Sequence, residues 1–179
     1  MWARLNGLEV DHLADSSAAD NRKSIGHSYC LPQPTADKVI LSSLLLKLIS
    51  RVGETLRSKN KLAQGLFIHW SYKNSGVGFG KQIKLTQPVD STEQFFNKAN
   101  NILTAEVLRD KVRLLMVGVF KLTVPTNQLN LFIDNPKKSL SKVFDSLNFK
   151  FGDGSLVYGR MLKTKKAAPY RIGFRKVDL

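Results

Sequence analysis

The chain has 179 residues and an ordinary hydrophobic fraction of 42%, which excludes a wholly disordered protein and allows one core with an appendage. Its charge is unusual, because 28 Lys and Arg residues oppose 14 Asp and Glu residues and leave a net charge of +14. Residues 1–21 hold one basic and four acidic residues, whereas residues 22–124 hold sixteen basic and six acidic ones. Residues 125–179 hold eleven basic and four acidic residues. The basic excess therefore belongs to the body and the tail of the chain, and it favours a polyanionic partner.

The single cysteine, Cys30, excludes an intramolecular disulfide and fits a reducing compartment, and we interpret it as a small buried residue. The apolar stretch Val39–Ile49 is interrupted by Ser42, Ser43 and Lys47, so it is too short to span a membrane. The N-terminus lacks the charged-then-apolar pattern of a signal peptide. We therefore expect a cytoplasmic protein with no membrane partner.

The first half of the chain predicts a strand and a helix after a polar linker. Residues 11–21 are small and polar, and residues 1–10 are too short for a domain, so they resemble the end of a missing one. A strand is expected over Lys23–Leu31, ended by Pro32 and Pro34. Thr35 would cap a helix that runs to about Ser58. Its apolar residues at helical spacing are Val39, Leu45, Leu48, Ile49, Val52 and Leu56.

A hairpin, a second helix and a last strand follow. Leu62–Tyr72 and Phe79–Thr86 alternate around the turn residues 74–76, with Trp70 and Tyr72 expected in the core. Asp90 or Ser91 caps a helix, and Val112–Val124 is strongly apolar. The inward residues of that helix would be Phe95, Phe96, Ala99, Ile102 and Leu103. The order β-α-β-β-α-β predicts an α+β fold in which two helices cover one face of a four-stranded antiparallel sheet and leave the other face open.

The segment after the last strand has the composition of a docking motif. Gln128–Phe132 reads QLNLF, with Leu131 and Phe132 as bulky anchors and Gln128 as the polar group that sets the register. The alternative interpretation is a short buried strand. Beyond it, Ser139–Phe149 has helical spacing and Ser155–Met161 is a strand candidate, which predicts a small helix–strand extension with a basic end.

Three motifs together resemble one family. They are RKSIGHS over residues 22–28, RLLMVGV over residues 113–119, and QLNLF. With the element order, they look like the little-finger domain of a Y-family translesion DNA polymerase of the DNA polymerase IV (DinB) type. Residues 2–7 are similar to the end of that family's thumb, and residues 143–154 resemble an extension found in many members, including UmuC-type proteins. The resemblance divides the chain into a thumb and linker remnant (1–21), a little finger (22–124), a clamp-binding segment (125–135) and a basic extension (136–179).

The resemblance implies a DNA-binding and sliding-clamp-docking region that acts in translesion synthesis, DNA repair and the SOS response. Its DNA contacts would be phosphate contacts to damaged or primer-template DNA without sequence preference, made by Lys23, Ser24, Gly26, His27, Ser28, Lys81, Lys84 and Arg113. The bacterial sliding clamp would bind Gln128, Leu129, Leu131 and Phe132. The palm carboxylates are missing, so we expect no catalytic residue, no metal and no cofactor in this chain, magnesium only in the missing palm, and no polymerisation by the chain alone. A separately encoded catalytic part would be a further partner.

Two other classes of function compete with this one. A stand-alone single-stranded nucleic-acid or RNA-binding protein on a ferredoxin-like sheet would display aromatic side chains on adjacent central strands, and the first and last predicted strands offer no exposed aromatic pair. An independent enzyme is disfavoured, because His12, His27 and His69 have no partners at metal-ligand spacing and no nucleophile–base pair is evident.

Overall fold

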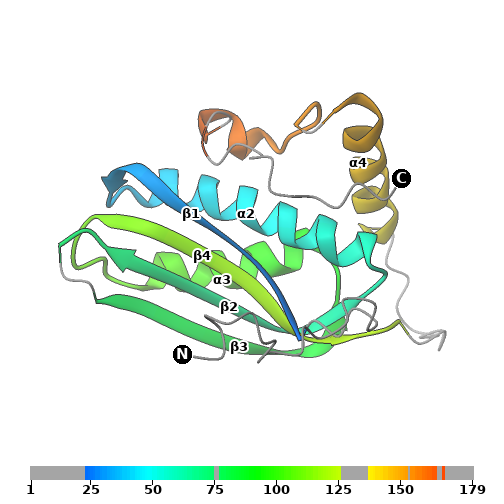
Figure 1. The fold of residues 1–179 in the computed structure, drawn as a ribbon, viewed down its shortest axis with the longest axis horizontal. Helices are drawn as coiled ribbons and strands as arrows, with labels where there is room; N and C mark the ends of the chain where they lie inside the picture. The colour runs from blue at the N-terminus through cyan, green and yellow to red at the C-terminus, as the bar shows by residue number, and fades with distance from the viewer. Residues whose placement is uncertain (1–22, 75–76, 126–136, 153, 165–166, 168–179) are drawn as a thin grey trace, which may run out of the picture.

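The computed structural model describes residues 23–74, 77–125, 137–152, 154–164 and 167. The strands are β1 (Ser24–Thr35), β2 (Leu62–Tyr72), β3 (Gly78–Val89) and β4 (Val112–Thr123). The helices are α2 (Lys38–Ser58), α3 (Thr92–Ala105), α4 (Lys137–Phe151) and the short 3-10 helix η1 (Gly159–Thr164) (Figure 1). The predicted order β-α-β-β-α-β is confirmed. The thumb remnant, the linker and QLNLF lie outside the described residues.

The four strands form one antiparallel sheet in the order β1-β4-β2-β3. β1 and β3 are therefore the edge strands. The crossover through α2 joins β1 to β2 with β4 between them, and the crossover through α3 joins β3 to β4 with β2 between them. Each crossover skips one strand, so all neighbouring strands run in opposite directions.

The core lies between this sheet and the two helices. On the helix-covered face, Leu115 of β4 is opposite Tyr29 of β1 and Trp70 of β2. Trp70 is fully buried, and its ring stacks on Phe79 of edge strand β3 with 4.3 Å between centroids. Its Nε1 donates a hydrogen bond to the Tyr72 hydroxyl at 3.2 Å. The predicted core placement of Trp70 and Tyr72 is confirmed.

The start of α2 differs from the prediction. β1 continues past Pro32 and Pro34 to Thr35, because an edge strand tolerates residues without an N–H donor. The helix therefore begins later: Asp37 is the N-cap, and its carboxylate accepts a hydrogen bond from the backbone N–H of Val39 at 2.7 Å. Val39 is 61% exposed, so its assignment to the apolar stripe was wrong. For the second helix, the Ser91 hydroxyl accepts from the backbone N–H of Gln94 at 3.4 Å and is the cap.

The C-terminal extension forms a third layer on the far side of α2 (Figure 1). The predicted helix is confirmed as α4, and its Phe144 stacks on Tyr158 at 4.8 Å between centroids. The predicted strand Ser155–Met161 is wrong. The Asn148 side chain donates to the backbone oxygen of Leu156 at 3.1 Å and accepts from its N–H at 2.8 Å, so these backbone groups are satisfied without a partner strand.

The chain then enters η1, which contacts α2. Met161 is only 5% exposed and belongs to the core. The Ser43 hydroxyl on α2 lies 2.5 Å from the buried Thr164 hydroxyl and donates to the backbone oxygen of Arg160 at 2.8 Å. The extension is thus packed onto the domain and covers the side of α2 that faces away from the sheet.

Candidate nucleic-acid interface

The face of the sheet opposite the helices, which we call the open face, carries few charged side chains. It consists of the residues that alternate with the core positions in the strand register. They are Ser24, Gly26, Ser28 and Cys30 of β1, Leu114, Met116, Gly118 and Phe120 of β4, Gly65, Phe67, His69 and Ser71 of β2, and Gly78, Gly80, Gln82 and Lys84 of β3. Among these residues Lys84 is the only Lys or Arg. The expectation of a strongly basic open face is therefore only partly met.

The two edges of the open face carry the polar groups. On β1, Ser24, Gly26 and Ser28 are exposed, and Lys23 is exposed directly before the strand. On β3, Gln82 and Lys84 are exposed. The structure therefore brings Ser24, Gly26 and Ser28 together on one edge and sets Lys84 on the opposite edge, while Lys23 precedes β1 and has no register partner.

Two residues predicted for DNA contact face the helices instead. His27 is opposite Val117 and Lys81 is opposite Ile68, and both of these partners are buried in the core. Burial, with a smaller contribution from the Arg51 guanidinium, holds the pKa of His27 below its usual value of 6.5. Lys81 remains exposed, because it lies on an edge strand. Since side chains of a strand alternate between faces, a shift of one position decides which surface each residue reaches.

Arg113 lies at one end of the sheet, in the irregular step between the pairs Ser71–Leu114 and Tyr72–Val112. Together with Lys73 it lines a hollow that also includes Cys30 and Pro32. Cys30 is exposed, which contradicts its interpretation as a buried residue. Its place opposite Leu114 on an edge strand turns it to the open face.

The centre of the open face holds two side chains that the sequence interpretation missed, Phe67 of β2 and Phe120 of β4. Both are half-buried and lie on the two adjacent central strands. The alternation of Leu66, Ile68 and Trp70 already indicated that Phe67 and His69 point outward. No comparable signal marked Phe120, because β4 is apolar on both faces.

The described residues hold neither a metal cluster nor a membrane span. Within the described ranges, no three His, Cys, Asp or Glu side chains come together in a way that would hold a metal ion. Over the same ranges, no helix combines the length and apolar character that a membrane crossing needs.

Residues 22–131 match the model of the impB/mucB/samB family C-terminal domain. Since the match covers more than half of the 179 residues, the chain belongs to this family, the little-finger region of Y-family DNA polymerases. The predicted resemblance and fold class are confirmed, apart from the strand expected in the extension.

Curated relatives are consistent with this assignment. The chain is 32% identical over 165 residues to DNA polymerase IV 2 of Bacillus subtilis (strain 168). This match covers 88% of the chain and 39% of that protein. It is 28% identical over 179 residues to DNA polymerase IV of Clostridium kluyveri. This second match covers 90% of the chain and 43% of that protein. The chain thus spans about two fifths of the length of these relatives.

One solved structure with a similar fold is a complex of a β-clamp processivity factor and the little finger domain of PolIV. The similarity covers 62% of the present chain and 99% of the matched chain in that complex. Its TM-score is 0.46, with 12% identity.

Proposed function

We propose that this chain is the DNA-binding and clamp-docking C-terminal region of a Y-family, DNA polymerase IV-like enzyme acting in translesion synthesis and repair. The open face would bind primer-template duplex through its phosphates. A separately encoded catalytic part and a cytoplasmic location belong to the same proposal. The observation that carries it is the layout of the open face, whose central strands contribute no Lys or Arg and whose two edges are polar.

The dimensions of the sheet support a duplex as the ligand. Three strand spacings separate β1 from β3, which amounts to about 14 Å. The major groove of B-form DNA is about 12 Å wide. The two edges are therefore spaced to meet the two phosphate backbones that border such a groove. Ser24 and Ser28 would donate from one edge, and Lys84 from the other.

The centre of the open face supports binding without sequence preference. Phe67, Met116 and Phe120 carry no N–H or O–H donor and no oxygen acceptor that would read base edges. On the central strands of this face, His69 and Ser71 are the polar side chains. Affinity would then come from phosphate contacts, which are the same for every sequence and weaken with salt. With about four to six phosphates neutralised, log K should fall with log salt at a slope of roughly −4 to −5.

Two lysines on one strand provide the test. Lys84 lies on the open face and Lys81 on the opposite face of β3, and both are exposed. In fluorescence-anisotropy titrations, Lys84→Gln should weaken duplex binding and reduce the salt slope by about 1, whereas Lys81→Gln should change neither. Equal effects of the two substitutions, or a flat salt dependence of the unchanged chain, would show that the open face is not the DNA surface.

One observation favours the alternative function. Phe67 and Phe120 lie on adjacent central strands of the open face, as aromatic side chains do in sheets that stack single-stranded bases. A single-strand binder would prefer oligonucleotides to duplex, so a direct comparison of the two affinities separates the functions. Chain length and salt must be matched in that comparison.

Clamp docking is the second half of the proposal. QLNLF follows β4 and precedes α4 in the sequence, and Gln128, Leu129, Leu131 and Phe132 would bind a hydrophobic cleft on the bacterial sliding clamp. The resemblance of the motif to clamp-binding segments supports this assignment. Burial of Leu131 and Phe132 would contribute about 1.5–3 kcal/mol each, offset in part by the ordering of the segment.

A further inference from the structure

Every strand of the sheet presents glycine on the open face. Gly26 of β1, Gly118 of β4, Gly65 of β2 and Gly80 of β3 all occupy such positions. Glycine weakens a strand, because it loses more conformational freedom on folding and leaves nothing to pack. Its presence at the same face of all four strands therefore calls for a reason other than the stability of the sheet.

Each of three rings lies over glycine on a neighbouring strand. Phe67 is directly opposite Gly118, and a Cβ built on Gly118 would lie 2.5 Å from two atoms of the Phe67 ring. A Cβ on Gly26, one strand further, would lie 3.3 Å from Cζ of the same ring. The ring of Phe67 therefore extends across β4 toward β1, along the sheet rather than out from it.

The same arrangement recurs on the other side of the sheet. Phe120 is opposite Gly65, where an added Cβ would overlap three atoms of the Phe120 ring. His69 is opposite Gly80, where a Cβ would lie 3.3 Å from Nδ1 of the His69 ring. The rings of Phe67 and Phe120 thus occupy the space that Cβ atoms on Gly118 and Gly65 would take. At Gly26 and Gly80 the same comparison gives a tight contact, with Phe67 and His69 respectively, so the three rings cover glycine backbone on all four strands.

From these contacts we infer that Gly26, Gly65, Gly80 and Gly118 are positioning residues that let the rings of Phe67, His69 and Phe120 lie along the sheet. They thereby keep the open face flat for duplex DNA. The inference deepens the proposed function and rests on it. A ring that lies on glycine stays low, so the edge groups Ser24, Ser28 and Lys84 reach phosphates on both sides of a groove at once. A ring forced upright would hold the duplex away from those edges.

The first experiment displaces one ring without a change of charge. Gly65→Ala leaves Phe120 no room to lie flat, so duplex binding should weaken by about tenfold, because binding must press an overpacked ring back onto the sheet. The loss should be equal for unrelated DNA sequences. Gly159→Ala is the matched control, since a Cβ there meets nothing within 4 Å, and its affinity should not change.

Removal of the Phe120 ring tests whether the loss of affinity in Gly65→Ala comes from the displaced ring. Phe120→Ala keeps the face flat and should retain duplex binding, and Gly65→Ala with Phe120→Ala should recover the affinity lost in Gly65→Ala. If Gly65→Ala does not fold, Gly80→Ala against His69 provides the same comparison with a smaller displacement. The melting temperature of each variant should also be measured, and the binding assays should be run at a temperature at which every variant is folded.

The outcomes separate this inference from the proposed function. If the unchanged chain shows no salt-sensitive duplex binding, the proposed function fails before any variant is measured. If it binds and Gly65→Ala binds equally well, only the flat-face inference is overturned. If Phe120→Ala loses single-stranded binding more than duplex binding, the rings are stacking platforms, and the inference is overturned in that way.

Discussion

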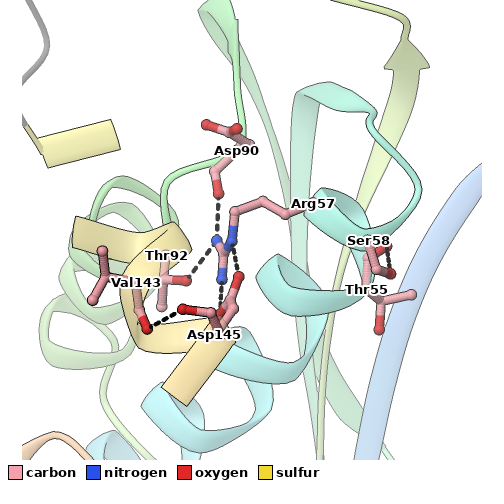
Figure 2. A network of polar contacts seen from close by, with 8 residues as sticks. Thr55, Arg57, Ser58, Asp90, Thr92, Val143 and Asp145 are labelled. Carbon is pink, nitrogen blue, oxygen red and sulfur yellow. Dashed lines mark hydrogen bonds and ion pairs between the residues drawn. The ribbon is translucent and has the colours of Figure 1, made fainter. Parts of the chain in front are cut away.

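The Arg57 guanidinium on α2 and the Asp145 carboxylate on α4 form a bidentate ion pair (Figure 2). Arg57 Nε donates to Asp145 Oδ2 at 2.5 Å, and Arg57 Nη2 donates to Asp145 Oδ1 at 2.9 Å. Nη1 of the same guanidinium donates to the backbone oxygen of Asp90 at 2.8 Å and to the Thr92 hydroxyl at 3.2 Å. One side chain therefore joins α2, the start of α3 and the extension. Both partners are shielded, with 9% and 25% of the two side chains exposed, so the pair is only weakly screened by solvent.

The first prediction concerns this pair. Asp145→Asn removes the negative charge and one acceptor, so the free energy of unfolding should fall by about 1.5–3 kcal/mol in a denaturant titration. Hydrogen exchange of α4 should also speed up. The control is Asp110→Asn, on the loop between α3 and β4, where the carboxylate accepts from the N–H of adjacent Lys111 at 2.6 Å. Equal stability of the Asp145→Asn variant and the unchanged chain would show that the extension is not held by Arg57 in solution.

The second prediction tests whether η1 belongs to the core. Met161 is 5% exposed and its neighbour Leu162 is 64% exposed. Met161→Ala should cost about 2–5 kcal/mol of unfolding free energy, because it leaves a cavity against α2. Leu162→Ala should stay within about 0.5 kcal/mol of the unchanged chain. A single cooperative transition in every variant would show that the extension unfolds together with the domain.

The third prediction follows from His27. Burial and the nearby Arg51 lower its pKa in the folded state, so the unfolded chain binds more protons at pH values below 6.5. The contribution of the neutral imidazole to stability is therefore fully present above pH 6.5 and is lost as the pH falls below that value. His27→Gln should remove this part of the pH dependence in denaturant titrations between about pH 7.5 and pH 5.

His69→Gln, on the other face of the sheet, is the control for that experiment. An NMR titration that places the pKa of His27 at or above 6.5 would contradict the prediction, because the histidine would then not be desolvated.

The fourth prediction separates the two interpretations of QLNLF. If the segment docks into the clamp, Leu131→Ala with Phe132→Ala should abolish clamp binding in calorimetry while the melting temperature changes little. For so short a motif, micromolar affinity is expected before substitution, about −8 kcal/mol. If the segment is a structural strand, the double substitution should instead lower the melting temperature by several degrees, about 4 °C per kcal/mol lost. Asn130→Ala serves as the control, since Asn130 is expected to face solvent.

Much of the molecule could be predicted from local pattern. The 3.6-residue period of α2, the alternation of Leu66, Ile68 and Trp70, and the turn residues after Tyr72 are properties of consecutive residues, so the order of elements and the core role of Trp70 follow from them. The motifs around Ser24–Ser28 and Arg113–Val119 likewise indicated the family. Asp37 escaped detection as the helix cap, because the run of β1 past two prolines depends on its place at the edge of the sheet.

The sequence by itself thus determined the element order, the core of the sheet and the family. The tertiary structure decided which face each strand residue occupies, because the face depends on register against strands distant in the chain. That register turned His27 and Lys81 toward the helices and brought Phe67 onto Gly118. It also decided that residues 155–158 are not a strand, since Asn148 supplies the hydrogen bonds that a neighbouring strand would have supplied. Periodicity is a property of neighbours in sequence, whereas pairing partners are set by packing across the whole domain.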